Sequence, residues 1–293
     1  MNRDDDQFQN ELLSTLPLGA VRYFDRTGST NDEAARWAAD GAPDLALVIA
    51  DEQTAGRGRL GRRWSTSAGT ALAFSLVLRP QALLPRRQEQ TTDLLPRLAG
   101  LGALAVCGGL EAAYALQPEI KWPNDVLLRR KKMAGVLVET HWQAEDMTAL
   151  ILGIGVNVAS ASVPPEGELA FPATCVERVL GGPVERWDLL RAILESLLAW
   201  RARLAEPEFL AAWEARLAFR GEVVQVNSGA GETVQGEALG LTSGGGLRLR
   251  LADGPSMNSG QVVERRFQIG ELRLRPVDSP PESAKLSGEE REA

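Results

Sequence analysis

An arginine- and glycine-rich segment is the part of the sequence best suited to chemistry. Residues 53–64 read QTAGRGRLGRRW and are separated by two residues from the apolar stretch LALVIA at residues 45–50. Glycines let backbone N–H groups converge on an anion, and guanidinium forks match phosphate and carboxylate geometry. The segment carries Arg57, Arg59, Arg62 and Arg63. It indicates a site for a small phosphate or carboxylate, with a solvated charged loop or a local nucleic-acid patch as alternatives.

Two phosphate-binding motifs are excluded for this segment. Its glycines are Gly56, Gly58 and Gly61, which spell G-x-G-x-x-G. A dinucleotide fingerprint needs a helix after these glycines and an acid about 20 residues later. No Asp or Glu occurs between residues 54 and 88, and a predicted strand follows. A P-loop needs Lys followed by Ser or Thr, and Arg62 and Arg63 stand there instead.

Three further segments carry groups of the same chemical kind. KWPND begins at Lys121, KMAG at Lys132, and GIGVN ends at Asn157. A lysine at a strand end is a suitable point charge for a phosphate or an acyl carboxylate, although a surface lysine is commoner. Pro123 ends regular strand pairing beside Lys121. Asn157 equally fits a turn residue.

Composition excludes several function classes. The chain has 293 residues and a net charge of −7, so bulk charge does not support a general nucleic-acid-binding surface. A single histidine, His141, makes a Ser-His-Asp hydrolase or a multi-histidine metal enzyme improbable. Cys107 and Cys175 cannot build a disulfide framework or a zinc site, so we expect no metal site and a reducing compartment, the cytoplasm. The acidic N-terminal residues predict no signal peptide.

The elements that position these groups follow from hydrophobic patterning. Strands are predicted at residues 20–25, 45–50, 71–78, 119–128, 133–140 and 147–158. Helices are predicted at residues 30–40, 98–116, 187–204 and 207–217. Thr30 and Glu33 fit a capping box for the first helix, and Gly41 ends it. The stretch 98–116 is long enough to span a bilayer, but its Ala and Gly content favours a helix packed closely on a sheet, with no membrane.

The pattern of the sequence changes near Phe219. Short strands separated by Gly-rich turns run from 221 to 276, which predicts a small β-barrel of about SH3 size. We therefore expect an α+β protein with an N-terminal extension, a main domain, a barrel and a disordered tail. Their predicted ranges are residues 1–19, 20–218, 219–277 and 278–293.

The motifs, taken together and in this order, resemble those of the biotin protein ligases. The matching segments are Ser29-Thr30-Asn31, QTAGRGRLGRRW, KWPND, KMAG and GIGVN, within a similarity that runs from about Ala20 to Pro276. The resemblance implies a mixed β-sheet with helices, a class II synthetase-like core, followed by an SH3-like barrel. Gly270-Glu271-Leu272 resembles a motif near the end of that barrel, whereas the stretch 254–260 is atypical.

The resemblance also implies roles for individual residues. The expected biotin-binding residues are Ser29, Thr30, Asn31, Gln53, Arg57, Gly58, Arg59 and Lys121. The expected nucleotide-binding residues are Lys132, Asn157 and Arg62. Lys121 and Arg59 would act in catalysis, by electrostatic stabilisation and positioning.

The implied activity has two half-reactions. Biotin and ATP give biotinyl-5′-AMP and pyrophosphate, with Mg²⁺ as cofactor, and a lysine of a biotin carboxyl carrier protein then takes the biotinyl group. Some relatives carry an N-terminal DNA-binding domain, which we do not expect here. A homodimer is one candidate assembly. The alternatives are a lipoate–protein ligase and a non-catalytic nucleic-acid or protein adaptor, and the latter predicts salt-sensitive nucleic-acid binding without ATP turnover.

Overall fold

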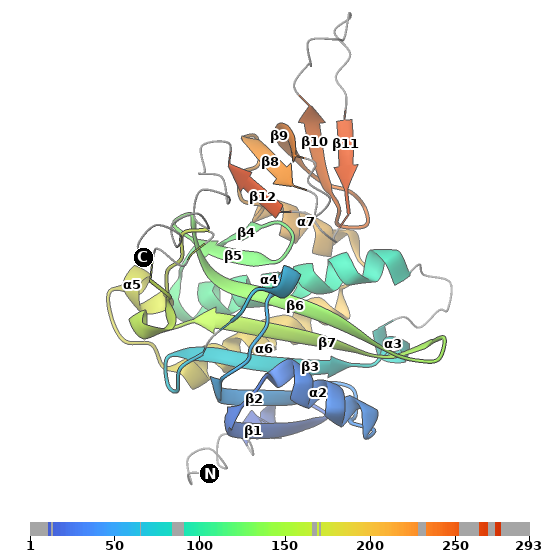
Figure 1. Ribbon diagram of the computed structural model, residues 1–293, viewed down its shortest axis with the longest axis vertical. Helices are drawn as coiled ribbons and strands as arrows, with labels where there is room; N and C mark the ends of the chain where they lie inside the picture. The colour runs from blue at the N-terminus through green and yellow to red at the C-terminus, as the bar shows by residue number, and fades with distance from the viewer. Residues whose placement is uncertain are drawn as a thin grey trace, which may run out of the picture.

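The computed structural model gives a seven-stranded mixed sheet, helices on both of its faces and a second, five-stranded sheet (Figure 1). It describes residues 11–12, 14–64, 66–83, 91–165, 169, 171–227, 233–251, 264–268 and 273–276. The predictions for residues 254–260, 270–272 and 278–293 lie outside this range, as does most of the predicted N-terminal extension. An α+β fold with two parts is confirmed.

The large sheet has the strand order β1-β2-β3-β7-β6-β5-β4. Its strands are β1 (Ala20–Thr27), β2 (Ala46–Gln53), β3 (Ala71–Leu78), β4 (Glu119–Lys121), β5 (Asp125–Leu128), β6 (Lys131–Gln143) and β7 (Asp146–Asn157). β1 and β2 are parallel, and the other neighbours are antiparallel. All eight residues of β3 are buried, which explains their nearly continuous apolar character.

Helices cover both faces of this sheet. They are α2 (Thr30–Ala39), α3 (Pro80–Leu83), α4 (Thr91–Tyr114), α5 (Val176–Leu180), α6 (Arg186–Ala202) and α7 (Pro207–Ala215). Alternate residues of β2 belong to two hydrophobic clusters: Ala46 and Val48 pack with α2, whereas Leu47 and Ile49 share a cluster with α4 and α6. This alternation is the two-residue period of a strand buried on both faces.

The small-residue helix predicted for 98–116 is the central helix α4. Its 20-residue stretch Leu95–Tyr114 has the length and composition to cross a membrane, the only such helix in the described part of the chain, and 72% of its apolar window is buried. Gly102 lies against Val136, and Gly109 lies against Ile193 of α6; an added Cβ would be 2.7 Å and 2.6 Å from these side chains. The small residues therefore allow close packing between the sheet and α6.

The C-terminal part forms an antiparallel sheet with the order β11-β10-β9-β8-β12. Its strands are β8 (Val223–Asn227), β9 (Thr233–Leu241), β10 (Leu247–Leu251), β11 (Glu264–Phe267) and β12 (Arg273–Pro276). This arrangement is consistent with the predicted SH3-like domain. Val224, Leu247 and Leu249 belong to the same buried cluster as α4 and α6, so the two parts of the chain share a hydrophobic core.

Two local predictions are wrong. Residues 119–128 form two antiparallel strands, β4 and β5, because the chain reverses at the cis Trp122–Pro123 bond and leaves Lys121 paired with Asp125. The capping box is also absent: Ser29 is the N-cap residue of α2 without a side-chain capping hydrogen bond. The Thr30 hydroxyl instead donates to Gln53 Oε1, at 3.0 Å.

Cys107 and Cys175 are both free and buried. The other predicted helices and strands are confirmed, with ends that differ by a few residues except at α4, which begins at Thr91 and not at residue 98.

Candidate active site

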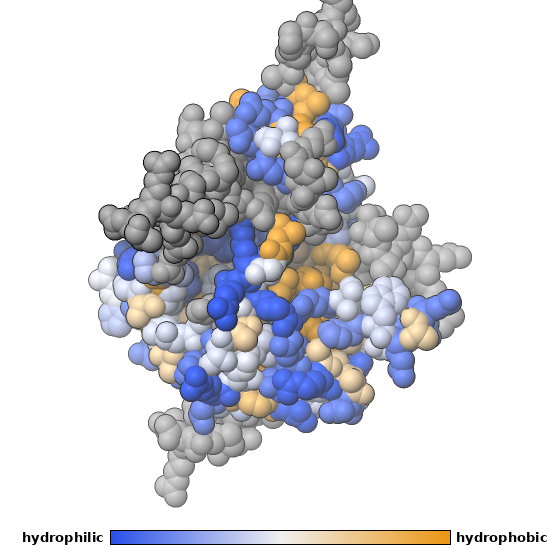
Figure 2. Space-filling view, viewed as in Figure 1, coloured by the Kyte–Doolittle hydropathy of each residue, from blue (hydrophilic) through white to orange (hydrophobic). Residues whose placement is uncertain are grey.

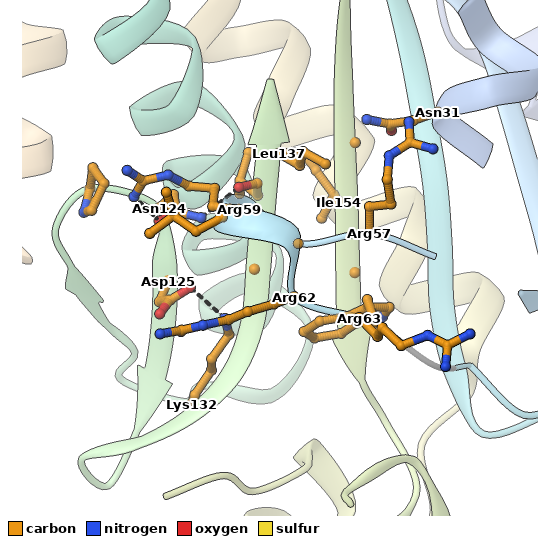
Figure 3. Close-up of a pocket in the computed structure, with 18 of the residues that line it drawn as sticks. Asn31, Arg57, Arg59, Arg62, Arg63, Asn124, Asp125, Lys132, Leu137 and Ile154 are labelled. Carbon is orange, nitrogen blue, oxygen red and sulfur yellow. Dashed lines mark hydrogen bonds and ion pairs between the residues drawn. The ribbon is translucent and has the colours of Figure 1, made fainter. Parts of the chain in front are cut away.

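A pocket lies over β6 and β7, between the start of α2, the arginine-rich loop after β2, and the turn between β4 and β5 (Figure 3). Ten of the eleven predicted site residues line it: Ser29, Thr30, Asn31, Gln53, Arg57, Gly58, Arg59, Arg62, Lys121 and Lys132. Segments separated by about 100 residues in the sequence therefore meet at one site.

The end of the pocket beside α2 is lined by the polar side chains of Ser29, Thr30, Asn31 and Gln53. Gln53 Oε1 accepts hydrogen bonds from the Thr30 backbone N–H, at 2.7 Å, and from the Thr30 hydroxyl. The fully buried Ser75 Oγ lies 2.7 Å from Thr30 Oγ1 and 2.6 Å from Asn31 Oδ1. This network holds the side chains in place, because each buried polar group has a partner. It can present hydroxyl and amide groups to a polar, uncharged ring.

Close packing requires the two glycines of GIGVN, Gly153 and Gly155. An added Cβ at Gly153 would lie 2.0 Å from Asn31 Oδ1, and one at Gly155 would lie 2.4 Å from the Trp64 ring. Only glycine allows Asn31 and Trp64 to lie directly on the sheet. The motif thus forms the floor of the pocket.

A buried cluster of charges lies at the opposite end. Asp125 Oδ2 is 3.2 Å from Lys121 Nζ, and Asp125 Oδ1 is 2.6 Å from Lys132 Nζ. Lys121 is 8% exposed and Asp125 6%. β4 and β5 present Lys121 and Asp125 from opposite sides of their turn, and β6 contributes Lys132. Two cations against one carboxylate leave this cluster with net positive charge.

Burial affects the pKa of both Lys121 and Asp125. Burial lowers the pKa of Lys121, and the Asp125 carboxylate partly opposes this shift while Lys132 reinforces it. Burial would raise the pKa of Asp125, but Lys132 and Lys121 outweigh it and hold that pKa well below its usual value. Asp125 is therefore ionised at neutral pH. The Lys121 ammonium also lies 4.8 Å from the centre of the Phe171 ring.

The arginine-rich loop covers the pocket and is held by acidic and amide groups. Arg57 forms ion pairs with Asp32, at 2.7 Å, and with Glu139, at 3.1 Å. Arg59 donates to Asn124 Oδ1 at 3.0 Å, which joins the loop to the turn between β4 and β5. Leu60 has a positive φ of 58° and is 44% exposed. Figure 2 shows hydrophilic residues beside a hydrophobic patch on this face of the molecule.

One predicted residue lies elsewhere. Asn157, the last residue of β7, is not among the lining residues of the pocket, and its amide donates to the Thr174 carbonyl oxygen at 3.1 Å. This hydrogen bond joins the end of β7 to the segment that contains Thr174.

Sequence reasoning missed several residues of the site. They are Asp32, Ser75, Asn124, Asp125 and Glu139. Ser75 had a signal, because it is the one hydroxyl in the apolar stretch ALAFSLVL, and a polar residue in a fully buried strand needs a partner. Asn124 and Asp125 belong to KWPND, but the pattern does not show that the strand reverses there.

The arrangement suits a reaction between two anions. The polar end beside α2 can orient a ligand. The cluster of Lys121, Asp125 and Lys132 can stabilise negative charge in a partly buried setting, where charge interactions are stronger than in water. The loop arginines add cations that reach the pocket from the solvent side.

Known proteins give an independent comparison. Residues 23–157 match the biotin/lipoate A/B protein ligase family. The chain is 38% identical to the biotin–[acetyl-CoA-carboxylase] ligase of Paracoccus denitrificans over 233 residues, which are 77% of this chain and 92% of that protein. It is also 38% identical to the bifunctional ligase/repressor BirA of Bacillus spizizenii over 62% of this chain, and it spans 54%, about half, of that longer relative.

The fold agrees with these matches. The solved structure of biotin protein ligase from Aquifex aeolicus in complex with biotin and ATP superposes with a TM-score of 0.71 and 27% sequence identity. The superposition covers 87% of this chain and 98% of that one, so both parts of the fold are included. The chain therefore belongs to the family of biotin protein ligases.

Proposed function

We propose that this protein activates biotin with ATP to biotinyl-5′-AMP and transfers the biotinyl group to a lysine of a biotin carboxyl carrier protein. The observation that carries the proposal is the placement of the Lys121–Asp125–Lys132 cluster in the same pocket as the Thr30–Gln53 network. One end suits a neutral ureido ring, and the other suits a carboxylate meeting a phosphate. The solved relative from Aquifex aeolicus is described as bound to biotin and ATP.

Biotin would bind with its ring toward α2. Ser29, Thr30 and Asn31 stand at the start of this helix. Because Gln53 Oε1 already accepts the Thr30 N–H, the side chains and the remaining N–H groups of the first turn would serve the ligand. Gln53 holds Thr30 through two hydrogen bonds and so preorganises this end. The valeryl chain would then extend along the pocket toward Lys121.

The first half-reaction needs electrostatic help rather than a base. The biotin carboxylate is itself the nucleophile: its oxygen forms a bond to the α-phosphorus of ATP while the bond to the pyrophosphate oxygen breaks, and pyrophosphate leaves with that electron pair. Lys121 and Lys132 would stabilise the charge that builds up on the α-phosphate. No histidine is required, which agrees with the single His141 of the chain.

The loop would act on the intermediate. Arg57, Gly58 and Arg59 would close over biotinyl-5′-AMP, and Arg62 would face the nucleotide. Closure keeps water from the mixed anhydride until the carrier lysine attacks its acyl carbon, which expels AMP. Asn157 does not line the pocket, so its predicted nucleotide contact would have to be indirect through the Thr174 chain.

The residues present fit a Mg²⁺ ion that enters with ATP. No three His, Cys, Asp or Glu side chains form a group among the described residues, and Asp125 is the only carboxylate among the described lining residues. Mg²⁺ commonly binds through substrate phosphates with one or two protein carboxylates. The ion would supply further charge neutralisation at the phosphates, and Asp125 is the residue able to approach it.

The alternatives differ in their predictions. A lipoate–protein ligase would use lipoate in place of biotin in the same first half-reaction. A nucleic-acid adaptor would need free arginines on the loop, but Arg57 is held by Asp32 and Glu139, and Arg59 is held by Asn124. These pairs favour an internal, ligand-directed role for the loop.

The test is exchange of labelled pyrophosphate into ATP with Mg²⁺ present. We expect exchange that depends on biotin and not on lipoate, followed by labelling of an apo carrier domain. Folded protein without biotin-dependent exchange would end the assignment. Exchange with lipoate alone would point to the related ligases.

A further inference from the structure

A turn of the C-terminal sheet is packed against the catalytic domain. It joins β9 to β10 and comprises residues 242–246. The turn is braced from within, because Gly245 N–H donates to the Thr242 carbonyl at 2.9 Å and Gly246 N–H donates to Thr242 Oγ1 at 2.9 Å. Three consecutive glycines, 244–246, are buried. A self-bonded, buried turn is a firm support for what it contacts.

The catalytic domain holds this turn from several elements. Trp122 Nε1, in the turn between β4 and β5, donates to the Gly245 carbonyl oxygen at 3.0 Å. Arg97 of α4 donates to the Ser243 carbonyl oxygen at 3.1 Å. Trp213 of α7 packs under Gly245, since an added Cβ there would lie 2.7 Å from its ring. Trp122 and Trp213 are both fully buried.

The backbone on the other side of Trp122 carries the charged cluster. Lys121 precedes Trp122 directly, and Asp125 follows three residues later. β4 is also held by the segment that connects the two domains: Ile120 N–H donates to the Arg216 carbonyl at 2.6 Å, and Ala218 N–H donates to the Ile120 carbonyl at 2.9 Å. The segment that presents Lys121 to the pocket is thus fastened from behind by C-terminal residues.

We propose that Trp122 is a positioning residue, through which the turn 242–246 holds Lys121 and Asp125 in their reactive geometry. The C-terminal sheet then contributes to adenylation through a buried hydrogen bond and its packing, apart from any contact with nucleotide or carrier. The kinetic part of this inference rests on the proposed function. Its structural part, the anchoring of residues 119–128, does not.

The chain offers a matched pair of variants for the test. Trp122→Phe removes the N–H that donates to Gly245, and Trp213→Phe removes the same atoms from a ring at the same interface. Trp213 Nε1 has no hydrogen-bond partner among the described residues. Both changes leave a similar void beside the turn, but only the first also removes a hydrogen bond to it, so the difference between the two variants isolates that bond.

A third variant loosens the turn without touching the catalytic domain. Thr242→Val keeps the size of the side chain and removes the hydroxyl that accepts from Gly246 N–H. It tests the same coupling from the other side, and it remains informative if Trp122→Phe does not fold.

The kinetic measurement separates positioning from general damage. We expect Trp122→Phe to lower kcat for adenylation by about 10-fold, since small misplacements of reacting groups have effects of this size or larger. KM for biotin should change less than kcat, because the Thr30–Gln53 network that would hold the ring lies at the opposite end of the pocket from Lys121. Trp213→Phe keeps kcat within about 2-fold, and Thr242→Val lowers it by about 3-fold.

Amide hydrogen exchange of residues 119–128 tests the anchoring without turnover. Exchange should rise in Trp122→Phe and Thr242→Val and stay near the wild-type rate in Trp213→Phe. Unchanged exchange in both anchor variants, or equal effects of the two tryptophan changes, would overturn the proposal. An inactive wild-type protein would refute the proposed function, and the exchange result would still decide on the anchor.

Discussion

Two charged regions face the same pocket but are built differently. Lys121 and Asp125 project from paired strands, and their side chains are 10% and 9% exposed. Arg57 and Asp32 meet at the solvent side of the pocket, with side chains 41% and 43% exposed. The first region is buried between paired strands, whereas the second joins an exposed arginine of the irregular loop to Asp32 of α2. The same ion-pair chemistry therefore has different consequences in the two places.

The two ion pairs differ in the free energy needed to separate them. A buried ion pair has given up its hydration, so removing one partner leaves an uncompensated charge and costs several kcal/mol. An exposed pair is worth about 0–1 kcal/mol and can exchange partners readily. The buried cluster is suited to stabilising a transition state, and the loop is suited to releasing its acids and closing over a ligand.

The largest expected effect is at the buried cluster. Lys121→Ala should slow biotin-dependent adenylation by ~10²-fold or more, as for loss of one preorganised electrostatic group. Pyrophosphate exchange measures this rate. Lys131→Ala is the matched control, because Lys131 is an exposed lysine at the start of β6 outside the pocket. An equal loss in both variants would show that bulk charge, not position, matters.

Asp125→Asn should lower the free energy of unfolding and change how that free energy and the adenylation rate depend on pH. It leaves Lys121 and Lys132 without their carboxylate, at a cost of about 3 kcal/mol in the free energy of unfolding at neutral pH. The folded-state pKa of Asp125 lies below its unfolded value of about 3.9. The stability from its ionised form is thus present above that value and lost as pH falls through the folded pKa.

Urea denaturation at neutral pH and at about pH 3 checks the sign. The difference between wild type and Asp125→Asn should shrink in acid, whereas Asp146→Asn, at the exposed start of β7, should change little at either pH. Asp125 also raises the pKa of Lys121. Its removal should therefore move the alkaline limb of the adenylation rate to lower pH, and an upward shift would contradict this assignment.

A smaller and different effect is expected on the loop. Arg59→Ala removes the link to Asn124 and weakens the closed loop, so biotinyl-5′-AMP should leave or hydrolyse about 10-fold faster, as for loss of one charged hydrogen bond. The apparent KM for biotin should also rise. A free-adenylate assay detects the escape, with Arg26→Ala, a 68% exposed arginine of β1, as control. If Arg59→Ala retains biotinyl-5′-AMP as the wild type does, the loop does not act in holding the intermediate.

The smallest effect is expected at the exposed ion pair. Asp32→Asn leaves Glu139 to hold Arg57, so the free energy of unfolding should change by less than about 1 kcal/mol. Thermal unfolding and the KM for biotin measure the result. A large loss of stability would mean that the loop is as firmly built as the cluster, and the comparison would fail.

The sequence was informative where a pattern had a local cause. The period-two and 3.6-residue patterns predicted the strands and helices of the core. Ten of the eleven site residues that the resemblance implies line one pocket. The patterns work because burial of apolar faces is a local demand on each element. The resemblance, rather than periodicity, supplied the roles of residues such as Gln53.

Long-range partners were not predictable in the same way. Glu139 meets Arg57 across 82 residues, and Trp122 meets Gly245 across 123. Such contacts depend on how elements pack in three dimensions. The capping box failed for the same reason: Gln53, 23 residues away, takes the Thr30 hydroxyl that the local motif assigned to the helix end.

A single-turnover experiment tests the division of roles most directly. Enzyme in excess of labelled ATP, with biotin and Mg²⁺, is quenched at intervals to follow formation of biotinyl-5′-AMP and then its release. We predict slow formation with normal retention in Lys121→Ala, and formation within about 3-fold of wild type with rapid release in Arg59→Ala. Wild-type formation in Lys121→Ala, or wild-type retention in Arg59→Ala, would contradict the account.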